Sequence, residues 1–320
     1  MKLDLENILS SGGAAQLRKA QVYGETDILS EVLICPPTYL EPVPCCAVTR
    51  ESVRQGFEVS PDEAMDQHVE LQNALARLGV TCRVLPPAPG LPDMCFTRDA
   101  AVTTPWGLLG LNPSMPHRRE EVTQLLQFAR ASGLRIFGRV DRGTVEGGDI
   151  CVARPGLLFI GCSGERTDEA GAQAVADIFR AAQWDAHIYR FDPHFLHLDT
   201  QFCMVAEGLA LACTAVLSDA FLALLDRNSI ELIDVSYEES QRLGCNILAL
   251  GDRRILSSSD NTRVNTVLRQ RGFRVETVNV SQFVQCGGGI HCLTMPIDRT
   301  EPASDAIEFQ HIASVLKRAF

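Results

Sequence analysis

Four short polar segments interrupt apolar stretches of this sequence, and each holds residue types that take part in catalysis. Two combine carboxylates with arginine or glycine, one pairs a histidine with an aspartate, and one places a His-Cys pair after three glycines. The segments are LPDMCFTRDAAV (91–102), TVEGGDICVA (144–153), HFLHLDTQF (194–202) and GGGIHCLTMP (287–296). A thiol, an imidazole and carboxylates are the groups that covalent catalysis with acid–base assistance requires.

Cys292 is the candidate nucleophile, because glycines before it allow the backbone to approach a substrate closely. His197 and Asp199 are two residues apart, so in a strand they share one face, and the aspartate could orient the imidazole. His291 adjoins Cys292, and in an extended segment the two face opposite ways. We therefore expect His197 to be the base. The structural alternatives are a flexible turn before a buried thiol, and a histidine satisfied within the core.

The acidic residues suggest what the thiol attacks. Asp93 and Asp99 flank an apolar MCF, which is also compatible with a turn carrying solvated acids. Glu146 and Asp149 surround a Gly pair, which is either a hairpin corner or a way to aim two carboxylates into a cleft. Carboxylates match a planar guanidinium in paired, bidentate fashion. The combination predicts an enzyme that attacks the central carbon of a guanidinium group.

Other chemistries lack their usual spacing in this chain. No H-x-x-x-H or C-x-x-C pair is present, so we expect no metal. A G-x-S-x-G nucleophile elbow is missing, and so is a G-x-G-x-x-G phosphate fingerprint after a first strand. We expect no cofactor.

The elements that must position these residues alternate along the chain. Amphipathic helical patterns with typical start and stop signals cover residues 60–79, 118–133, 167–183 and 261–272. Short β-like runs lie between them: VLICPP, CRVLP, AAVTT, GLLGLN, RIFGRV, DICVA, LLFIG, HIYRF, FCMVAE, LALAC, NILALG, RILSS and RVETVNV. Paired strands often follow each other without a helix, which fits a doubly wound sheet less well. The pattern predicts an α/β protein of repeated units forming a single catalytic domain, residues 1–320.

Composition narrows the functional class. The 320 residues are 46% hydrophobic and 22% charged, with a formal net charge of −11 and no Lys/Arg cluster, so we expect no nucleic-acid partner. No apolar run is long enough for a membrane span, and the start MKLDLENILSSGG lacks the apolar core of a secretory signal. Most of the twelve cysteines lie in apolar contexts, which favours packing in a reduced, cytoplasmic protein.

The strings FTRD (96–99), EGGD (146–149), HLDT (197–200) and GGG-x-H-C-x-T-x-P (287–296), together with GERT (164–167), resemble the guanidino-group-modifying enzymes. These are the arginine deiminases, dimethylarginine dimethylaminohydrolases and amidinotransferases. The resemblance implies a pentein fold, a five-bladed α/β propeller of ββαβ-type units around a central active site. It also implies that Cys292 is the nucleophile and that His197 is the general acid and base.

The same resemblance implies the remaining roles. The guanidinium would be bound by Asp99 and Asp199, with Asp149 as a further carboxylate near it, and Glu146 would orient His197. The substrate α-carboxylate would be held by Arg166 together with Arg118 or Arg119. Asp93, where deiminases usually carry Asn, could contact the α-amino group. We expect a small guanidino compound as the only ligand and a homo-oligomer as the assembly.

The motifs favour a hydrolase that converts arginine or an Nω-substituted arginine to citrulline. FTRD and HLDT resemble the deiminases, whereas dimethylarginine hydrolases tend to carry an acid at Arg98 and a lysine at Asp199. Amidinotransferases tend to have a tryptophan after the catalytic cysteine, where this chain has Leu293. An amidinotransferase, and a compact arginine dihydrolase that yields ornithine, remain alternatives. A pentein-like binding module without catalysis has no reason to keep the thiol, histidine and carboxylates together.

Overall fold

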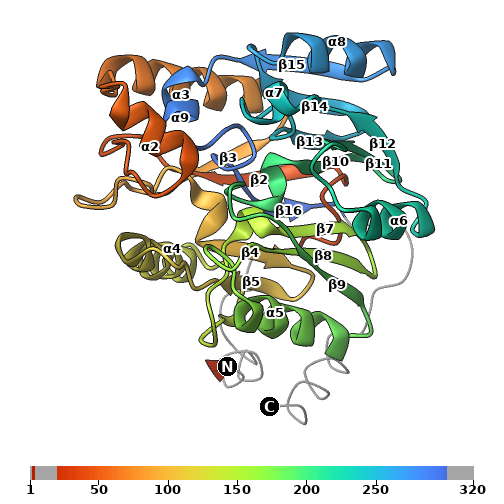
Figure 1. Ribbon diagram of the computed structural model, residues 1–320. Coiled ribbons are helices and arrows are strands. Elements are labelled where there is room, and N and C mark those ends of the chain that lie inside the picture. Colours follow the sequence, from red (N-terminus) through yellow and green to blue (C-terminus); the bar gives the residue numbers. More distant parts are fainter. Residues whose placement is uncertain (1, 4–19, 301–320) are drawn as a thin grey trace.

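The computed structural model describes residues 2–3 and 20–300, and its strands form five small sheets around a common centre (Figure 1). Four sheets have three strands, and in the remaining sheet the two-residue strand β1 (Lys2–Leu3) adds a fourth strand at the edge. The expected five-bladed α/β propeller is confirmed. That residues 1–320 form one catalytic domain stays a prediction.

Each blade is built from the same unit, an antiparallel pair, a helix and a third strand parallel to the second. In one blade, β7 (Ile150–Arg154) pairs antiparallel with β8 (Leu157–Cys162), α5 (Glu169–Ala181) follows, and β9 (Asp185–Arg190) runs parallel to β8. A helix must intervene because a parallel neighbour requires a crossover connection.

Three further blades repeat this order. Their elements are β4 (Ala101–Thr104), β5 (Gly107–Gly110), α4 (Arg119–Ala131) and β6 (Ile136–Arg139); β10 (Phe202–Ala206), β11 (Leu209–Ala212), α6 (Asp219–Arg227) and β12 (Glu231–Asp234); and β13 (Leu248–Gly251), β14 (Arg254–Ser258), α8 (Thr262–Gln270) and β15 (Arg274–Val278). The short helix α7 (Tyr237–Ser240) lies between the last two of these blades in sequence.

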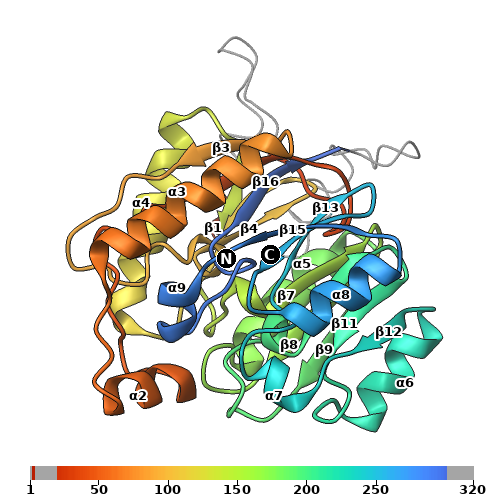
Figure 2. The ribbon, with the colours of Figure 1, turned by 90° about the horizontal axis from the view of Figure 1, so that it is seen from above.

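The fifth blade closes the ring with strands from both halves of the chain. β16 (Met295–Arg299) pairs antiparallel with β2 (Leu29–Ile34), and β3 (Thr81–Val84) runs parallel to β2. Between β2 and β3 lie α2 (Ala47–Arg54) and α3 (Pro61–Arg77). The short helix α9 (Ser281–Gln285) precedes β16, and in Figure 2 it lies between α3 and α2.

Burial explains why strands and helices take these places. The first two strands of a blade are almost wholly buried, as in LLFIGC of β8, whereas third strands such as β3 are partly exposed. The helices put one apolar face on the sheets, and α5 is capped at its start by the Asp168 side chain, which accepts from the Gly171 N–H. Consequently the first two strands of each blade are packed on both faces.

Candidate active site

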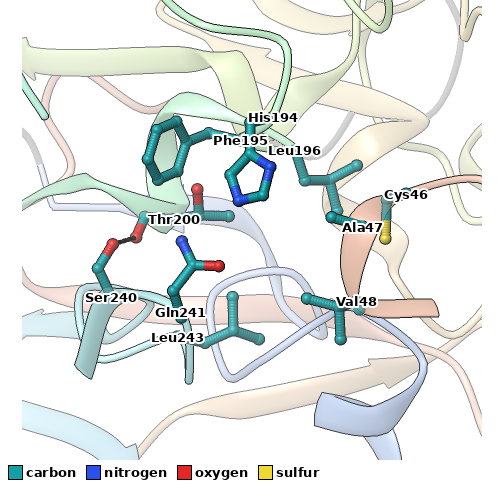
Figure 3. A pocket seen from close by; sticks show the side chains of 11 residues that line it. Cys46, Ala47, Val48, His194, Phe195, Leu196, Thr200, Ser240, Gln241 and Leu243 are labelled. Atoms are coloured by element: carbon teal, nitrogen blue, oxygen red, sulfur yellow. Dashed lines mark hydrogen bonds between the residues drawn. The ribbon is translucent and has the colours of Figure 1, made fainter. Parts of the chain in front are cut away.

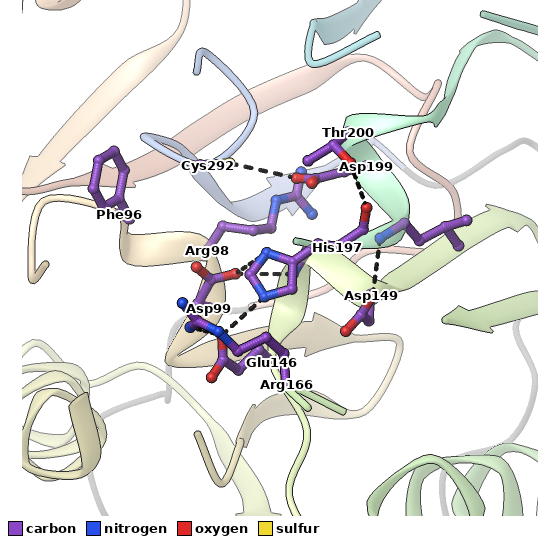
Figure 4. A network of polar contacts seen from close by, with 12 residues as sticks. Phe96, Arg98, Asp99, Glu146, Asp149, Arg166, His197, Asp199, Thr200 and Cys292 are labelled. Carbon is purple, nitrogen blue, oxygen red and sulfur yellow. Dashed lines mark hydrogen bonds and ion pairs between the residues drawn. The ribbon is translucent and has the colours of Figure 1, made fainter. Parts of the chain in front are cut away.

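The candidate site is assembled from the segments that lead into the first strand of each blade. Three of these segments form single 3₁₀ turns, η1 (Thr97–Asp99) before β4, η3 (Gly147–Asp149) before β7 and η4 (Leu198–Thr200) before β10. Cys292 precedes β16 in the same way. The side chains from these turns converge on one buried cluster (Figure 4).

The expectation that His197 and Asp199 share a strand face is wrong. His197 caps the η4 turn and Asp199 lies inside it, so the two side chains take different partners. His197 Nε2 lies 2.8 Å from Glu146 Oε2, while Asp199 Oδ2 lies 2.8 Å from His291 Nδ1. A turn of this kind separates neighbouring side chains that a strand would align.

His197 is surrounded by carboxylates and has almost no contact with solvent. Its Nδ1 lies 3.7 Å from Asp99 Oδ1 and has no hydrogen-bond partner among the described residues. Burial alone would lower the pKa of His197, but the Asp99 carboxylate, the hydrogen bond to Glu146 and the Asp149 carboxylate raise it to about 10. The imidazole is therefore a cation at neutral pH.

Two arginines balance the charge of these carboxylates. Arg118 Nη1 lies 2.7 Å from Asp99 Oδ2, and the rest of its guanidinium contacts Glu121 and the carbonyl oxygens of Asp93 and Phe96. Burial opposes ionisation of Asp99, yet the charges of His197 and Arg118 hold its pKa below the ordinary value.

Arg166 approaches the cluster from the GERT segment. Its Nη1 lies 2.9 Å from Glu146 Oε2, the oxygen that also meets His197, and its Nη2 lies 3.1 Å from Cys45 Sγ. Burial disfavours the Glu146 carboxylate, but Arg166 and His197 hold its pKa far below the ordinary value. Glu146 therefore stays ionised between two cations.

Cys292 is buried against an amide and a carboxylate. Asn246 Nδ2 donates to its Sγ at 3.3 Å, and Asp199 Oδ2 lies 3.6 Å from the same sulfur. Burial raises the pKa of the Cys292 thiol well above its ordinary value, and the charges of Asp199 and Asp99 raise it further. Without a ligand the group is thus a neutral thiol.

The prediction that His291 faces away from Cys292 is also wrong. Residues 290–293 form a turn rather than an extended segment, so both residues reach Asp199 Oδ2. The His291 N–H donates to Asn246 Oδ1 at 2.9 Å. Asn246 therefore holds the backbone beside the nucleophile with one end of its amide and contacts the sulfur with the other.

Each glycine of the GGG string has its own reason to lack a side chain. Gly287 has φ +91°, a left-handed conformation. A Cβ on Gly288 would lie 2.3 Å from the Phe96 ring, and one on Gly289 would lie 2.6 Å from Asn246 Oδ1. In the EGGD string, a Cβ on Gly148 would lie 2.6 Å from His197 Nδ1. The glycines let the site residues pack against backbone.

The other predicted residues take varied positions. Asp93 lies beside the cluster with its Oδ2 2.7 Å from His117 Nε2. Asp149 is buried, and its Oδ1 accepts from the Leu198 N–H, which supports the η4 turn. Arg118 is buried in the cluster, whereas Arg119 is exposed at the start of α4. The structure thus brings Arg118, and not Arg119, to the other predicted residues.

A small, partly open cavity is lined by the nucleophile. Its walls include Asp93, Asp99, Arg118, Arg166 and Cys292 together with Cys45, Cys46, Thr49, Phe96, Leu196, Cys286, Gly287 and Gly288. Its volume is about 20 Å³, room for about one water molecule. A guanidinium group is larger than this space, so we expect side chains of the wall to shift when a substrate binds.

The side chains that line a second cavity are drawn in Figure 3. The two cavities share Cys46, Leu196 and Gly287 in their linings, so they are neighbours. The second cavity is also lined by His194, which is exposed, and by Val48 in α2. The second cavity therefore extends from the catalytic cavity toward the exposed His194.

Two groups of described side chains are close enough together to hold a cation, namely Asp99 with Glu146 and His197, and Glu25 with Cys203 and His291. Their carboxylates already meet guanidinium groups, from Arg118 and Arg166 in the first group and from Arg98 in the second. Positive charge is thus supplied to both groups by arginine.

Among the described residues no helix has the length and apolarity to cross a membrane.

Three residues of the site were not predicted from the sequence. Asn246 contacts the nucleophile, His117 contacts Asp93, and Glu121 contacts Arg118. One signal for Asn246 was present. It lies two residues before β13, and Asp99 lies at the same distance before β4. Without the knowledge that a blade begins here, CNILAL shows only an isolated amide in an apolar run.

Fold and site together define a pentein with a cysteine, a histidine and paired carboxylates at its centre. The N-terminal domain of ArgZ, a cyanobacterial arginine dihydrolase, has a similar fold, with a TM-score of 0.75 at 20% identity over 85% of this chain and 98% of that one. A DDAH structure from Pseudomonas aeruginosa, complexed with citrulline, has a TM-score of 0.71 at 21% identity over 84% of this chain and 99% of that one.

Sequence comparison gives the family. The sequence model "N,N dimethylarginine dimethylhydrolase, eukaryotic" matches residues 47–299, and the chain belongs to this family. It is 29% identical to the uncharacterised protein YkgA of Bacillus subtilis over 279 residues, 87% of this chain and 94% of that one. It is 26% identical to the N(G),N(G)-dimethylarginine dimethylaminohydrolase of P. aeruginosa over 73% of this chain and 88% of the relative. The prediction of a C–N hydrolase acting on linear amidines is confirmed.

Proposed function

We propose that this protein hydrolyses the guanidinium group of arginine or an Nω-substituted arginine through a covalent intermediate on Cys292, releasing ammonia or an amine and citrulline. The observation that carries the proposal is the setting of the nucleophile. Its sulfur lies beside Asp199, a buried cationic His197 lies beside Asp99, and Asp199 Oδ1 has no hydrogen-bond partner among the described residues. An unpaired buried carboxylate oxygen calls for a donor.

A guanidinium is the donor that fits. It is planar, and it offers paired N–H groups to carboxylates. Asp99 and Asp199 come from different blades, and both raise the pKa of the Cys292 thiol. A cation bound between them offsets that effect, because a positive charge favours the thiolate. Substrate binding would therefore lower the pKa of the thiol, so that its proton passes to solvent water and the thiolate forms in place.

The thiolate then attacks the guanidinium carbon, and the S–C bond forms. His197 gives its proton to the departing nitrogen, the C–N bond breaks, and an S-alkyl thiouronium remains on Cys292. The neutral imidazole next takes a proton from water, whose oxygen attacks the same carbon. Collapse of that adduct breaks the S–C bond, returns the thiolate and releases the ureido product. Glu146 and Asp99 stabilise the charged form of the imidazole.

The remaining charged groups on the cavity wall would bind the amino-acid end of the substrate. Arg166 is proposed to hold the α-carboxylate, and Asp93 to contact the α-amino group. Both line the cavity that contains Cys292. Arg118 has most of its donors engaged by protein oxygens, so its main effect would be to keep Asp99 ionised and oriented.

The test is a product assay that does not assume the substrate. The enzyme is incubated with arginine, dimethylated arginines or agmatine in labelled water, with and without glycine as an amine acceptor, and products are identified by mass. The proposal predicts a labelled ureido product from one of these substrates alone, and none from Cys292→Ser. A requirement for the acceptor would indicate an amidinotransferase, and ornithine with two ammonias would indicate a dihydrolase.

A further inference from the structure

A buried polar chain lies beneath the nucleophile and is not used by the steps above. It runs from Glu25 through Arg98 and His291 to Asp199, and all four residues are at most 5% exposed. Arg98 Nη1 lies 3.3 Å from Glu25 Oε1, and Arg98 Nη2 lies 2.6 Å from His291 Nε2. Arg98, the residue that distinguishes FTRD from an acidic variant, therefore points away from the cavity and toward His291.

The partners of His291 dictate where its ring proton sits. A guanidinium can only donate, so Nε2, facing Arg98, must accept and carries no hydrogen. A carboxylate can only accept, so Nδ1, 2.8 Å from Asp199 Oδ2, must carry the hydrogen. Glu25 Oε2 is a more distant neighbour at 3.6 Å from Nε2. The ring is thus fixed as the Nδ1–H tautomer.

The backbone of His291 is fixed as firmly as its ring. Its N–H donates to Asn246 Oδ1, and its carbonyl oxygen accepts from Arg98 Nε at 3.4 Å. Arg98 therefore contacts both the ring and the backbone of one residue. A donor held in this way has little freedom, so the Asp199 carboxylate that receives its hydrogen bond is oriented too.

We propose that His291 is a positioning residue, whose Nδ1–H, fixed by Arg98, turns Asp199 so that one oxygen faces Cys292 and the other is left for a cationic substrate. This rests on the proposed function, because it assigns a direction to the carboxylate that the substrate meets. His291 itself exchanges no proton during the reaction. Its effect is to make the surroundings of the sulfur selective for a planar cation.

Two replacements separate the Nδ1 donor from the rest of the ring. The amide nitrogen of His291→Asn falls where Nδ1 lies and can still donate to Asp199. The amide of His291→Gln falls where Nε2 lies and faces Arg98 instead. Both variants carry the same amide group, and the one extra methylene of Gln decides which ring nitrogen the amide replaces, so loss of the aromatic ring itself would affect both.

The probes are chloroacetamidine, a planar cationic electrophile, and chloroacetamide, its neutral counterpart, with alkylation of Cys292 followed by mass spectrometry. We expect wild type to prefer the cation. His291→Gln should lower that preference about 10- to 100-fold, the range of a hydrogen bond to a charged group, while His291→Asn keeps most of it. Thermal unfolding shows whether each variant is folded.

The outcomes are distinct. A preference that survives His291→Gln, or that both variants lose alike while folded, overturns the positioning role and leaves the proposed function intact. If His291→Gln does not fold, a folded His291→Asn that has lost the preference overturns the role by itself. A wild-type enzyme without any preference for the cation overturns the proposed function, and the positioning role with it.

Discussion

Replacing Asn246 tests how the nucleophile is kept reactive. The Asn246→Ala variant loses the donor 3.3 Å from Cys292 Sγ and the acceptor of the His291 N–H. A hydrogen bond to a charged group contributes about 1.5–3 kcal/mol, and one pKa unit corresponds to about 1.4 kcal/mol. The thiol pKa should therefore rise by about 1–2 units, so the thiolate population falls about 10- to 100-fold at a pH below that pKa. The unpaired N–H should cost about 1–3 kcal/mol in unfolding free energy.

The assay is the pH dependence of chloroacetamide labelling. Trypsin releases residues 275–299 as one peptide with two cysteines, so Cys286 serves as an internal reference for Cys292. Asn246→Asp is the control, since it keeps an acceptor for the His291 N–H while placing a negative charge at the sulfur. It should slow labelling at least as much as Asn246→Ala. Identical pH profiles for wild type and Asn246→Ala would refute this account of the thiol.

Three further predictions concern the other groups. Arg166→Ala should lower kcat/KM for arginine about 10- to 100-fold more than for agmatine, which lacks the α-carboxylate; equal losses would mean that Arg166 acts only through Glu146. Gly148→Ala should displace the His197 ring and abolish turnover with the fold retained, because the new Cβ would lie 2.6 Å from Nδ1; normal kcat would contradict the packing. The pKa of His197 rises from 6.5 to about 10 on folding. Its protonation therefore stabilises the folded state fully below pH 6.5, and this stabilisation is lost toward pH 10. Between pH 6.5 and 10 the unfolding free energy of wild type should therefore fall by a few kcal/mol more than that of His197→Gln, as measured by urea unfolding. If the unfolding free energies of the two proteins change with pH in parallel, the pKa shift is refuted.

The sequence predicted the blade rhythm because its signals are local. The pattern over residues 60–79 corresponds to α3 and that over 261–272 to α8, and the apolar runs DICVA and LLFIG correspond to β7 and β8. Shorter or less regular elements were not predicted. They include α2 and α6, β12 with the sequence ELID, and β16, which contains a proline, a residue that argues against a strand.

Which residues contact one another within the site was harder to predict than which residues belong to it. The strings pointed to the segments that converge, yet His197 pairs with Glu146, 51 residues away, and Asp199 pairs with His291, 92 residues away. The spacing in HLDT suggested a strand, and only the 3₁₀ turn shows that its two polar side chains separate. Asn246 can be recognised as a site residue only when it is known that β13 begins a blade, which is a property of the folded ring.

The most direct test of the central claim is the mass of the adduct on Cys292. The enzyme is mixed with the substrate that turns over, quenched during turnover, and the peptide 275–299 is weighed. Attack at the guanidinium carbon with loss of the terminal nitrogen predicts a mass gain of arginine less ammonia on Cys292. A gain equal to the amidino group alone would contradict the hydrolase and indicate transfer. Turnover with no adduct on Cys292, or with full activity in Cys292→Ser, would contradict the covalent mechanism itself.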